Sequence, residues 1–282
     1  AVTTLFCMSL MVYFLTFSNT QESYMNGVSV MALYSFLLGL ALGSFMNVCI
    51  YRIPLKKSII HPPSSCPNCG KKIRFYDNIP LVSYLLLLGK CRYCRHPISW
   101  RYPTVEVLTG FLSLALFIRY GLSYQYILYF LFTASLVTIS FIDLHHQIIP
   151  DVLSLPGIGL GLATAFIPGN ISWLDSVIGI IGGGGVLFLV AEAYERLTGR
   201  QGMGGGDVKL LAMIGAWMGW KSLPFILLIS SLTGAFIGFI FLLAAGKGYR
   251  VRIPFGPFLS LGGLLYFFFG AQLTRWYFNV LL

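Results

Sequence analysis

The sequence predicts an all-α polytopic membrane protein of about eight transmembrane helices, with one small loop domain on the cytoplasmic side. Hydrophobic residues make up 57% of the 282 residues and charged residues only 10%, whereas a soluble domain carries about 25% charge. The apolar residues also form runs long enough to cross a bilayer, rather than short amphipathic periods. A chain with this composition is an integral membrane protein.

Nine apolar runs follow one another along the chain. The first, from about Leu5 to Phe17, lies within residues 1–27, which we treat as an extra N-terminal segment: either a genuine span or upstream sequence, because Met25 would be a natural start. The other runs lie near residues 28–50, 102–118, 126–142, 152–167, 177–193, 208–218, 224–245 and 254–269. The expected division is therefore a first transmembrane helix at 28–50, a loop domain at 51–101 and a helical membrane domain at 102–282.

Positive charge is concentrated in the loop domain. Ten of the 19 Lys and Arg residues lie between Arg52 and Arg101, with Asp77 as the only acid of that stretch. By the positive-inside rule, such a loop beside apolar spans is cytoplasmic. Alternation of the spans then places residues 143–151, 195–207 and 246–252 on the same side. Anionic membrane lipids explain the net charge of +10, and we expect no nucleic-acid partner.

Four cysteines of this loop form two Cys-x-x-Cys pairs, Cys66 with Cys69 and Cys91 with Cys94, separated by 21 residues. In a cytoplasmic loop, metal binding is favoured over disulfides. Each pair can hold one side of a tetrahedral zinc ion, and Gly70 suits the tight turn after the first pair. Four thiolates leave no open coordination position, so the zinc is expected to be structural. A redox dithiol or a loop without metal is the alternative.

Two acids lie where predicted spans meet the cytoplasmic face. Asp143 ends one apolar run, and Asp207 opens another directly after Gly204, Gly205 and Gly206. A carboxylate at that depth is costly and usually marks a functional site. Two carboxylates that share a proton can activate water and protonate the scissile amide, as in aspartic proteases. The glycines would let a substrate backbone lie against the site. For a single acid, a helix cap is the simpler explanation.

Helix dipoles suggest how the two acids differ. Asp143 ends its helix, where the dipole disfavours negative charge, and Asp207 begins its helix, where the dipole favours it. Asp207 is therefore predicted to be the ionised base and Asp143 to carry the proton. Asp151 is a rival to Asp143, but its place after Pro150 at the start of a span is better explained as an N-cap.

Three further residues are candidates for a second site. Gly43 follows Gly39 by four residues, a spacing that allows close helix packing. Asn47 is a polar amide inside an apolar run and requires a partner. Glu106 is another acid within an apolar run and is a candidate partner or site residue.

In their order along the chain, these strings resemble the type IV prepilin peptidases, also called prepilin leader peptidases. The resemblance covers roughly residue 28 to the C-terminus. It rests on Gly43-Ser-Phe-Met-Asn-Val, Tyr51-Arg-Ile-Pro, the two Cys-x-x-Cys pairs, Arg101-Tyr-Pro-Thr-Val-Glu106, Asp143 with Ile149-Pro-Asp151, and Gly204-Gly-Gly-Asp207. The last string carries the Gly-x-Gly-Asp motif of this class of proteases.

The resemblance implies an enzyme of the bacterial inner (cytoplasmic) membrane that cuts the basic leader of prepilins or pseudopilins after a glycine. Asp143 and Asp207 would be its catalytic pair, in the membrane domain 102–282. The resemblance also implies N-methylation of the new N-terminus with S-adenosylmethionine, associated with Gly43, Asn47 and Glu106 and with the cysteine loop. The chain has no glycine-rich Rossmann fingerprint, so the methyl donor rests on the resemblance alone.

Two other functions fit part of the pattern. The first is a non-enzymatic membrane transporter or assembly scaffold with a zinc-stabilised loop, because intramembrane acids and glycine-rich helices also mark transport sites. The second is an intramembrane protease of the presenilin or signal-peptide-peptidase kind, which shares the Gly-x-Gly-Asp motif. The four-cysteine loop argues against the second of these.

Overall fold

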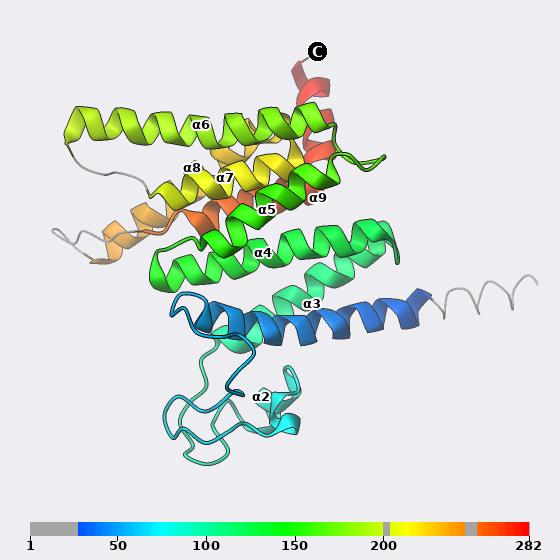
Figure 1. Cartoon of the computed structure of the whole chain (residues 1–282), viewed down its shortest axis with the longest axis vertical. Coiled ribbons are helices and arrows are strands. Elements are labelled where there is room, and N and C mark those ends of the chain that lie inside the picture. Colours follow the sequence, from blue (N-terminus) through cyan, green and yellow to red (C-terminus); the bar gives the residue numbers. More distant parts are fainter. Residues whose placement is uncertain (1–27, 200–203, 246–252, 282) are drawn as a thin grey trace, which may run out of the picture. The chain divides into compact units, whose positions relative to one another are not determined.

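The structure, a computed structural model, describes residues 28–199, 204–245 and 253–281, and the expected N-terminal segment 1–27 lies outside them. The described residues form a helical protein (Figure 1). Its long helices are the N-terminal helix Val28–Arg52, α3 (Arg101–Tyr120), α4 (Tyr124–His146), α5 (Asp151–Thr164), α6 (Trp173–Thr198), α7 (Gly205–Met218), α8 (Leu223–Ala245) and α9 (Gly256–Leu281). The loop between the first helix and α3 contains the short elements η1 (Phe75–Asn78) and α2 (Val82–Leu86).

Each of the eight apolar runs predicted from residue 28 onward coincides with one of these helices, which confirms the all-α membrane fold class. Within the described residues, five helical stretches are long and apolar enough to cross a membrane: the N-terminal helix, α3, α4, α6 and Trp220–Leu243. Helices α5 and α7 have 14 residues each, which corresponds to about 21 Å and is less than the roughly 30 Å of a bilayer core. A helix of this length that enters the bilayer has one end at membrane depth, where other helices must surround it.

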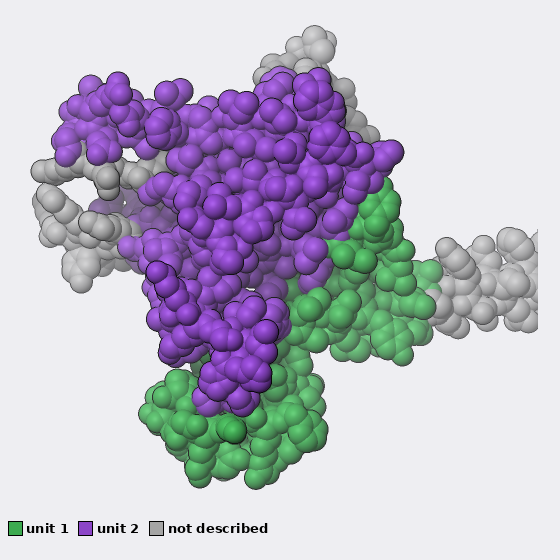
Figure 2. Space-filling model, in the orientation of Figure 1, with its two compact units in different colours: residues 1–44, 66–127 green, residues 45–65, 128–282 purple. Residues whose placement is uncertain are grey.

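The chain divides into two compact units (Figure 2). Of the described residues, 28–44 and 66–127 form the first unit, and 45–65 with those from 128 onward form the second. In the first unit, α3 packs closely on the N-terminal helix. A Cβ at Gly39 would lie 2.6 Å from the Cβ of Ser113, and a Cβ at Gly43 would lie 2.8 Å from the Cα of Glu106. The predicted close packing at these small residues is thus confirmed.

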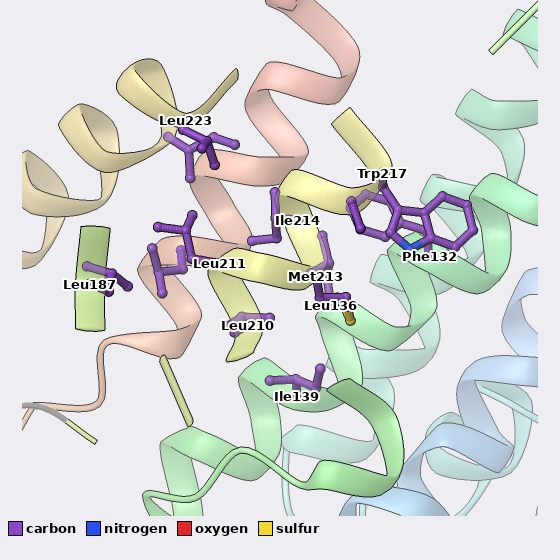
Figure 3. Packing of buried hydrophobic residues seen from close by; sticks show 13 residues of the cluster. Phe132, Leu136, Ile139, Leu187, Leu210, Leu211, Met213, Ile214, Trp217 and Leu223 are labelled. Atoms are coloured by element: carbon purple, nitrogen blue, oxygen red, sulfur yellow. The ribbon is translucent and has the colours of Figure 1, made fainter. Parts of the chain in front are cut away.

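The core of the second unit is built around α7. After Lys209 this helix is apolar on all sides, as is typical of a helix buried among others, and residues 210–217 are all buried. Figure 3 shows Leu210, Leu211, Met213, Ile214 and Trp217 of α7 among side chains of the neighbouring helices. The Trp217 ring stacks on Phe132 of α4 with ring centroids 4.9 Å apart. Its Nε1 donates to the carbonyl oxygen of Gly157 in α5 over 2.8 Å.

Glycines bring α6 and α7 into backbone contact. A Cβ at Gly215 of α7 would clash with the carbonyl group of Gly179 in α6, and a Cβ at Gly183 would lie 2.6 Å from the carbonyl oxygen of Leu211. Small residues at a helix interface permit this approach in membranes, where van der Waals packing drives helix association. Packing on all sides fixes α7, and with it the residues at its N-terminal end.

Candidate active site and metal centre

The four loop cysteines form one cluster. The Sγ atoms of Cys66, Cys69, Cys91 and Cys94 all lie within 4.8 Å of one another, and those of Cys66 and Cys94 are 3.8 Å apart. A tetrahedral ion with Zn–S bonds of about 2.3 Å requires sulfur atoms about 3.8 Å apart. The predicted cluster is therefore compatible with zinc.

The two Cys-x-x-Cys pairs have the same backbone geometry. In the first, Gly70 N donates to Cys66 O over 2.9 Å, and in the second, Arg95 N donates to Cys91 O over 3.0 Å. The residue at this position is left-handed in both turns, with φ of +68° at Gly70 and +57° at Arg95. Glycine reaches this conformation without steric cost, so the predicted role of Gly70 is confirmed.

The cluster also favours thiolates at its second pair. The backbone N–H of His96, with help from the Asn68 side chain, lowers the pKa of Cys94 to about 6. Backbone N–H groups of Cys94 and Tyr93 lower the pKa of Cys91. Thiolates are the form that binds metal, and a full set of four leaves no place for a substrate or an activated water. This chemistry fits a structural metal.

Asp207 lies in the first turn of α7, after the glycines that precede it. Gly204 is the N-cap of the helix, and the Asp207 N–H donates to its carbonyl oxygen over 3.1 Å. Helix α7 thus presents a carboxylate at its positive end. A Cβ at Gly206 would lie 2.9 Å from the Cβ of Ile149, whereas a Cβ at Gly205 would meet no atom of the described residues within 4 Å. Packing therefore explains Gly206 but not Gly205.

Asp143 lies near the end of α4, and only 5% of its surface is exposed. Its Oδ2 accepts a hydrogen bond of 2.9 Å from the backbone N–H of Gly256, the first residue of α9. Such an N–H has no partner inside its own helix. A Cβ at Gly256 would lie 2.6 Å from Asp143 Oδ2, so only glycine fits there without a shift of the carboxylate.

The second unit brings the two acids together. The side chain of Ile149 lies against both Gly206 and Gly256. Gly206 directly precedes Asp207 in the chain, and the N–H of Gly256 donates to Asp143. The two carboxyl groups are also close enough to interact electrostatically. Two acids in such a place can hold a shared proton and act as acid and base.

Sequence reasoning missed the role of Gly256. The only signal was the string Ile253-Pro-Phe-Gly-Pro257 at the start of the last apolar run, where a glycine between prolines marks a special backbone. The predicted protonation of Asp143 was incomplete because the contact with Gly256 was not foreseen. That prediction considered α4 alone, but the Asp143 carboxylate also lies at the N-terminus of α9, where the dipole favours negative charge.

Asp151 is not a helix N-cap, so that interpretation is wrong. Pro150 occupies the N-cap position of α5, and no side chain accepts a capping hydrogen bond there. Asp151 is the first helical residue, and its Oδ1 pairs with Lys209 Nζ of α7 over 2.6 Å. Its exposed ion pair with Lys209 distinguishes it from the buried Asp143.

The three residues of the possible second site lie on two helices. In the first unit, Glu106 of α3 lies against Gly43, is 7% exposed and accepts a hydrogen bond of 2.9 Å from Leu81 N. A hydroxyl group from Ser44 also contacts it. Asn47 is buried one turn further along the N-terminal helix, at 2% exposure.

Comparison with known proteins gives two family matches. Residues 37–120 match the bacterial peptidase A24 N-terminal domain, and residues 130–239 match the type IV leader peptidase family. No solved structure gives a significant match.

Several characterised relatives are each named prepilin leader peptidase/N-methyltransferase. The protein of Aeromonas hydrophila is 41% identical over 266 residues, which is 86% of this chain and 92% of that protein. The protein of Pseudomonas aeruginosa is 40% identical over 268 residues, with 87% and 92% covered. The protein of Legionella pneumophila is 39% identical over 264 residues, with 86% and 92% covered.

The fold and these matches define a multi-pass membrane peptidase. The chain belongs to the type IV leader peptidase family, as its resemblance to the prepilin peptidases predicted. The expected enzyme class, a prepilin peptidase that is also an N-methyltransferase, is confirmed at the level of the family. The relatives do not favour a transporter or a scaffold.

Proposed function

We propose that this chain cleaves the basic leader of type IV prepilins or pseudopilins after a glycine, at the cytoplasmic face of the membrane, with Asp143 and Asp207 as the catalytic pair. The observation that carries the proposal is the meeting of a buried carboxylate at one helix N-terminus with a second carboxylate at another. The names of the relatives supply the substrate class.

The pair would work with one proton between two carboxyl groups. The ionised group takes a proton from a water molecule, whose oxygen then attacks the scissile carbonyl carbon. The protonated group gives its proton to the carbonyl oxygen, which forms a tetrahedral diol. As the C–N bond breaks, the group that took the proton of water gives it to the leaving amine, and a hydroxyl of the diol returns its proton to the other carboxylate. The open position beside Gly205 would admit the extended backbone of the leader next to Asp207.

The second activity would transfer a methyl group from S-adenosylmethionine to the newly exposed N-terminal amine. Its support is the name shared by the relatives. Gly43, Asn47 and Glu106 remain the candidate residues for it. Zinc bound by Cys66, Cys69, Cys91 and Cys94 would hold the loop domain together without taking part in either reaction.

Cleavage of a prepilin-like substrate by the purified protein tests the proposal. We expect Asp143→Asn and Asp207→Asn each to abolish leader release, and Asp151→Asn, whose native carboxylate forms a surface ion pair, to retain it. S-adenosylmethionine in the same reaction would add the mass of a methyl group to the product. A folded wild-type protein that never cleaves, or an active Asp143→Asn variant, would refute the assignment.

A further inference from the structure

The loop domain has an apolar surface that neither the active pair nor the cysteine cluster explains. Leu85, Leu86 and Leu88 are 70%, 78% and 81% exposed, and we call them the α2 leucine cluster. The opposite face of α2 is packed: Ser83 is buried and donates to the carbonyl oxygen of Tyr76 over 2.9 Å. Adjacent, highly exposed leucines outside the spanning helices mark a surface that binds a partner.

Two contacts fix α2 beside the beginning of α3. The backbone N–H of Leu81, just before α2, donates to Glu106 Oε2 over 2.9 Å. The ring of Tyr84, inside α2, lies against the ring of Trp100, with centroids 5.6 Å apart. Trp100 is the residue before α3. Helix α2 is therefore held at the level where α3 begins.

The length of α3 places that level at the membrane boundary. Helix α3 has 20 residues and rises about 30 Å, which is about the thickness of the hydrocarbon core. Its Arg101 end therefore cannot lie far from the bilayer, and Glu106 lies about 7 Å deeper along the helix. Since Leu81 is hydrogen-bonded to Glu106, the chain enters α2 at the depth of the lipid headgroups.

We propose that the α2 leucine cluster is an interfacial anchor that inserts into the cytoplasmic leaflet beside α3, with lipid as its occupant. Trp100 is 76% exposed, and tryptophan is enriched at this depth of a bilayer. Lys90, two residues after Leu88, is exposed, and Arg92, four residues after it, is also exposed but pairs with Asp77 over 2.6 Å. Apolar side chains beside basic ones match the acyl chains and anionic headgroups of one leaflet.

The anchor would give the loop domain a second attachment to the membrane besides the spanning helices. Leu85 and Leu86 belong to α2 and Leu88 lies two residues after it, and hydrogen bonds of Leu81 and Ser83 fix this segment. Insertion therefore requires no rearrangement of the domain. This inference concerns the loop domain alone and holds or fails independently of the proposed catalytic pair.

Photo-crosslinking in the full-length protein tests the inference. p-Benzoylphenylalanine replaces Leu86 in one sample and Lys72, an exposed polar position of the same domain, in a matched control. Both proteins are reconstituted in vesicles of phosphatidylethanolamine and phosphatidylglycerol and irradiated. We expect a phospholipid adduct from position 86 and little or none from position 72.

A second variant separates anchoring from accidental proximity. With the probe still at position 86, Leu85→Ser and Leu88→Ser together should lower the lipid adduct about tenfold, because the apolar side chains that drive insertion are lost. The absence of a lipid adduct at position 86 in the otherwise unchanged protein would overturn the inference. So would an adduct formed only with an added prepilin, which would make the cluster a protein-binding surface.

Discussion

Replacing Gly256 by alanine tests whether the start of α9 positions Asp143. The new Cβ would lie 2.6 Å from Asp143 Oδ2 and 3.2 Å from its Cγ, whereas ordinary contact begins at 3.4 Å. The carboxylate must therefore move by several tenths of an ångström. The new Cβ would also lie 3.3 Å from Ile149 Cδ1, which leaves the methyl group little room to move away from the carboxylate.

The expected effect is larger on catalysis than on stability. A displacement of about 1 Å in a catalytic group costs about 100-fold in rate, so we expect kcat for leader cleavage to fall by about 100-fold with a smaller change in KM. Overpacking of a buried site costs typically 1–3 kcal/mol, which leaves the protein folded. Initial rates with a purified prepilin substrate at several concentrations would separate kcat from KM.

Gly263→Ala is the matched control for this variant. Gly263 lies in the same helix, but a Cβ there would meet its nearest atoms, in the Ile214 side chain, at 3.4 Å, an ordinary contact. Cleavage by that variant should remain within a few-fold of wild type, because Asp143 is not displaced. Wild-type kcat in a folded Gly256→Ala protein would refute the positioning of Asp143 by Gly256.

Three more predictions concern the ion pair of Asp151, the cysteine cluster and the glycines before Asp207. Asp151→Asn should change the free energy of unfolding by less than about 1 kcal/mol, because its ion pair with Lys209 is exposed; a thermal melt of the variant checks this, and a loss of several kcal/mol would contradict it. Cys91→Ser should lower the zinc content measured by elemental analysis and increase proteolysis of the loop domain, since three thiolates bind the ion less well than four; unchanged zinc content would exclude this ligand set. Gly205→Ala should keep full stability, because its Cβ meets no atom of the described residues within 4 Å, yet raise KM if the leader backbone lies there. Gly206→Ala should also destabilise the protein. Equal kinetics of Gly205→Ala and wild type would argue against that substrate path.

Local sequence patterns were enough to predict the helices and the metal cluster. An apolar run long enough to cross a bilayer must be helical there, because lipid offers no partner for backbone polar groups. The long runs from residue 28 onward accordingly became helices, and the shorter runs of α5 and α7 did so as well. The cysteine cluster was predictable because each Cys-x-x-Cys pair folds locally and the pairs need only one closing segment.

The contacts that complete the candidate site are not local. Gly256 and Asp143 are 113 residues apart, and Lys209 and Asp151 are 58 residues apart. Apolar runs show that helices exist but not which helix ends meet. The prediction from helix dipoles left out α9 for this reason. The N-cap expectation for Asp151 failed because α5 begins one residue earlier than expected, with Pro150 at the N-cap, and the ion pair with Lys209 could not be foreseen.

The contact between Asp143 and α9 changes how the proposed pair should be viewed. If Asp143 lay only at the end of α4, its helix would oppose its charge and the pair would be fixed as one acid and one base. Instead, each carboxylate lies at a helix N-terminus, Asp143 at α9 and Asp207 at α7. Helix dipoles therefore no longer distinguish them. What still differs is access: Asp143 is 5% exposed, whereas Asp207 is only partly buried. Water and substrate would then approach from the side of Asp207, with Asp143 held in place behind it by Gly256.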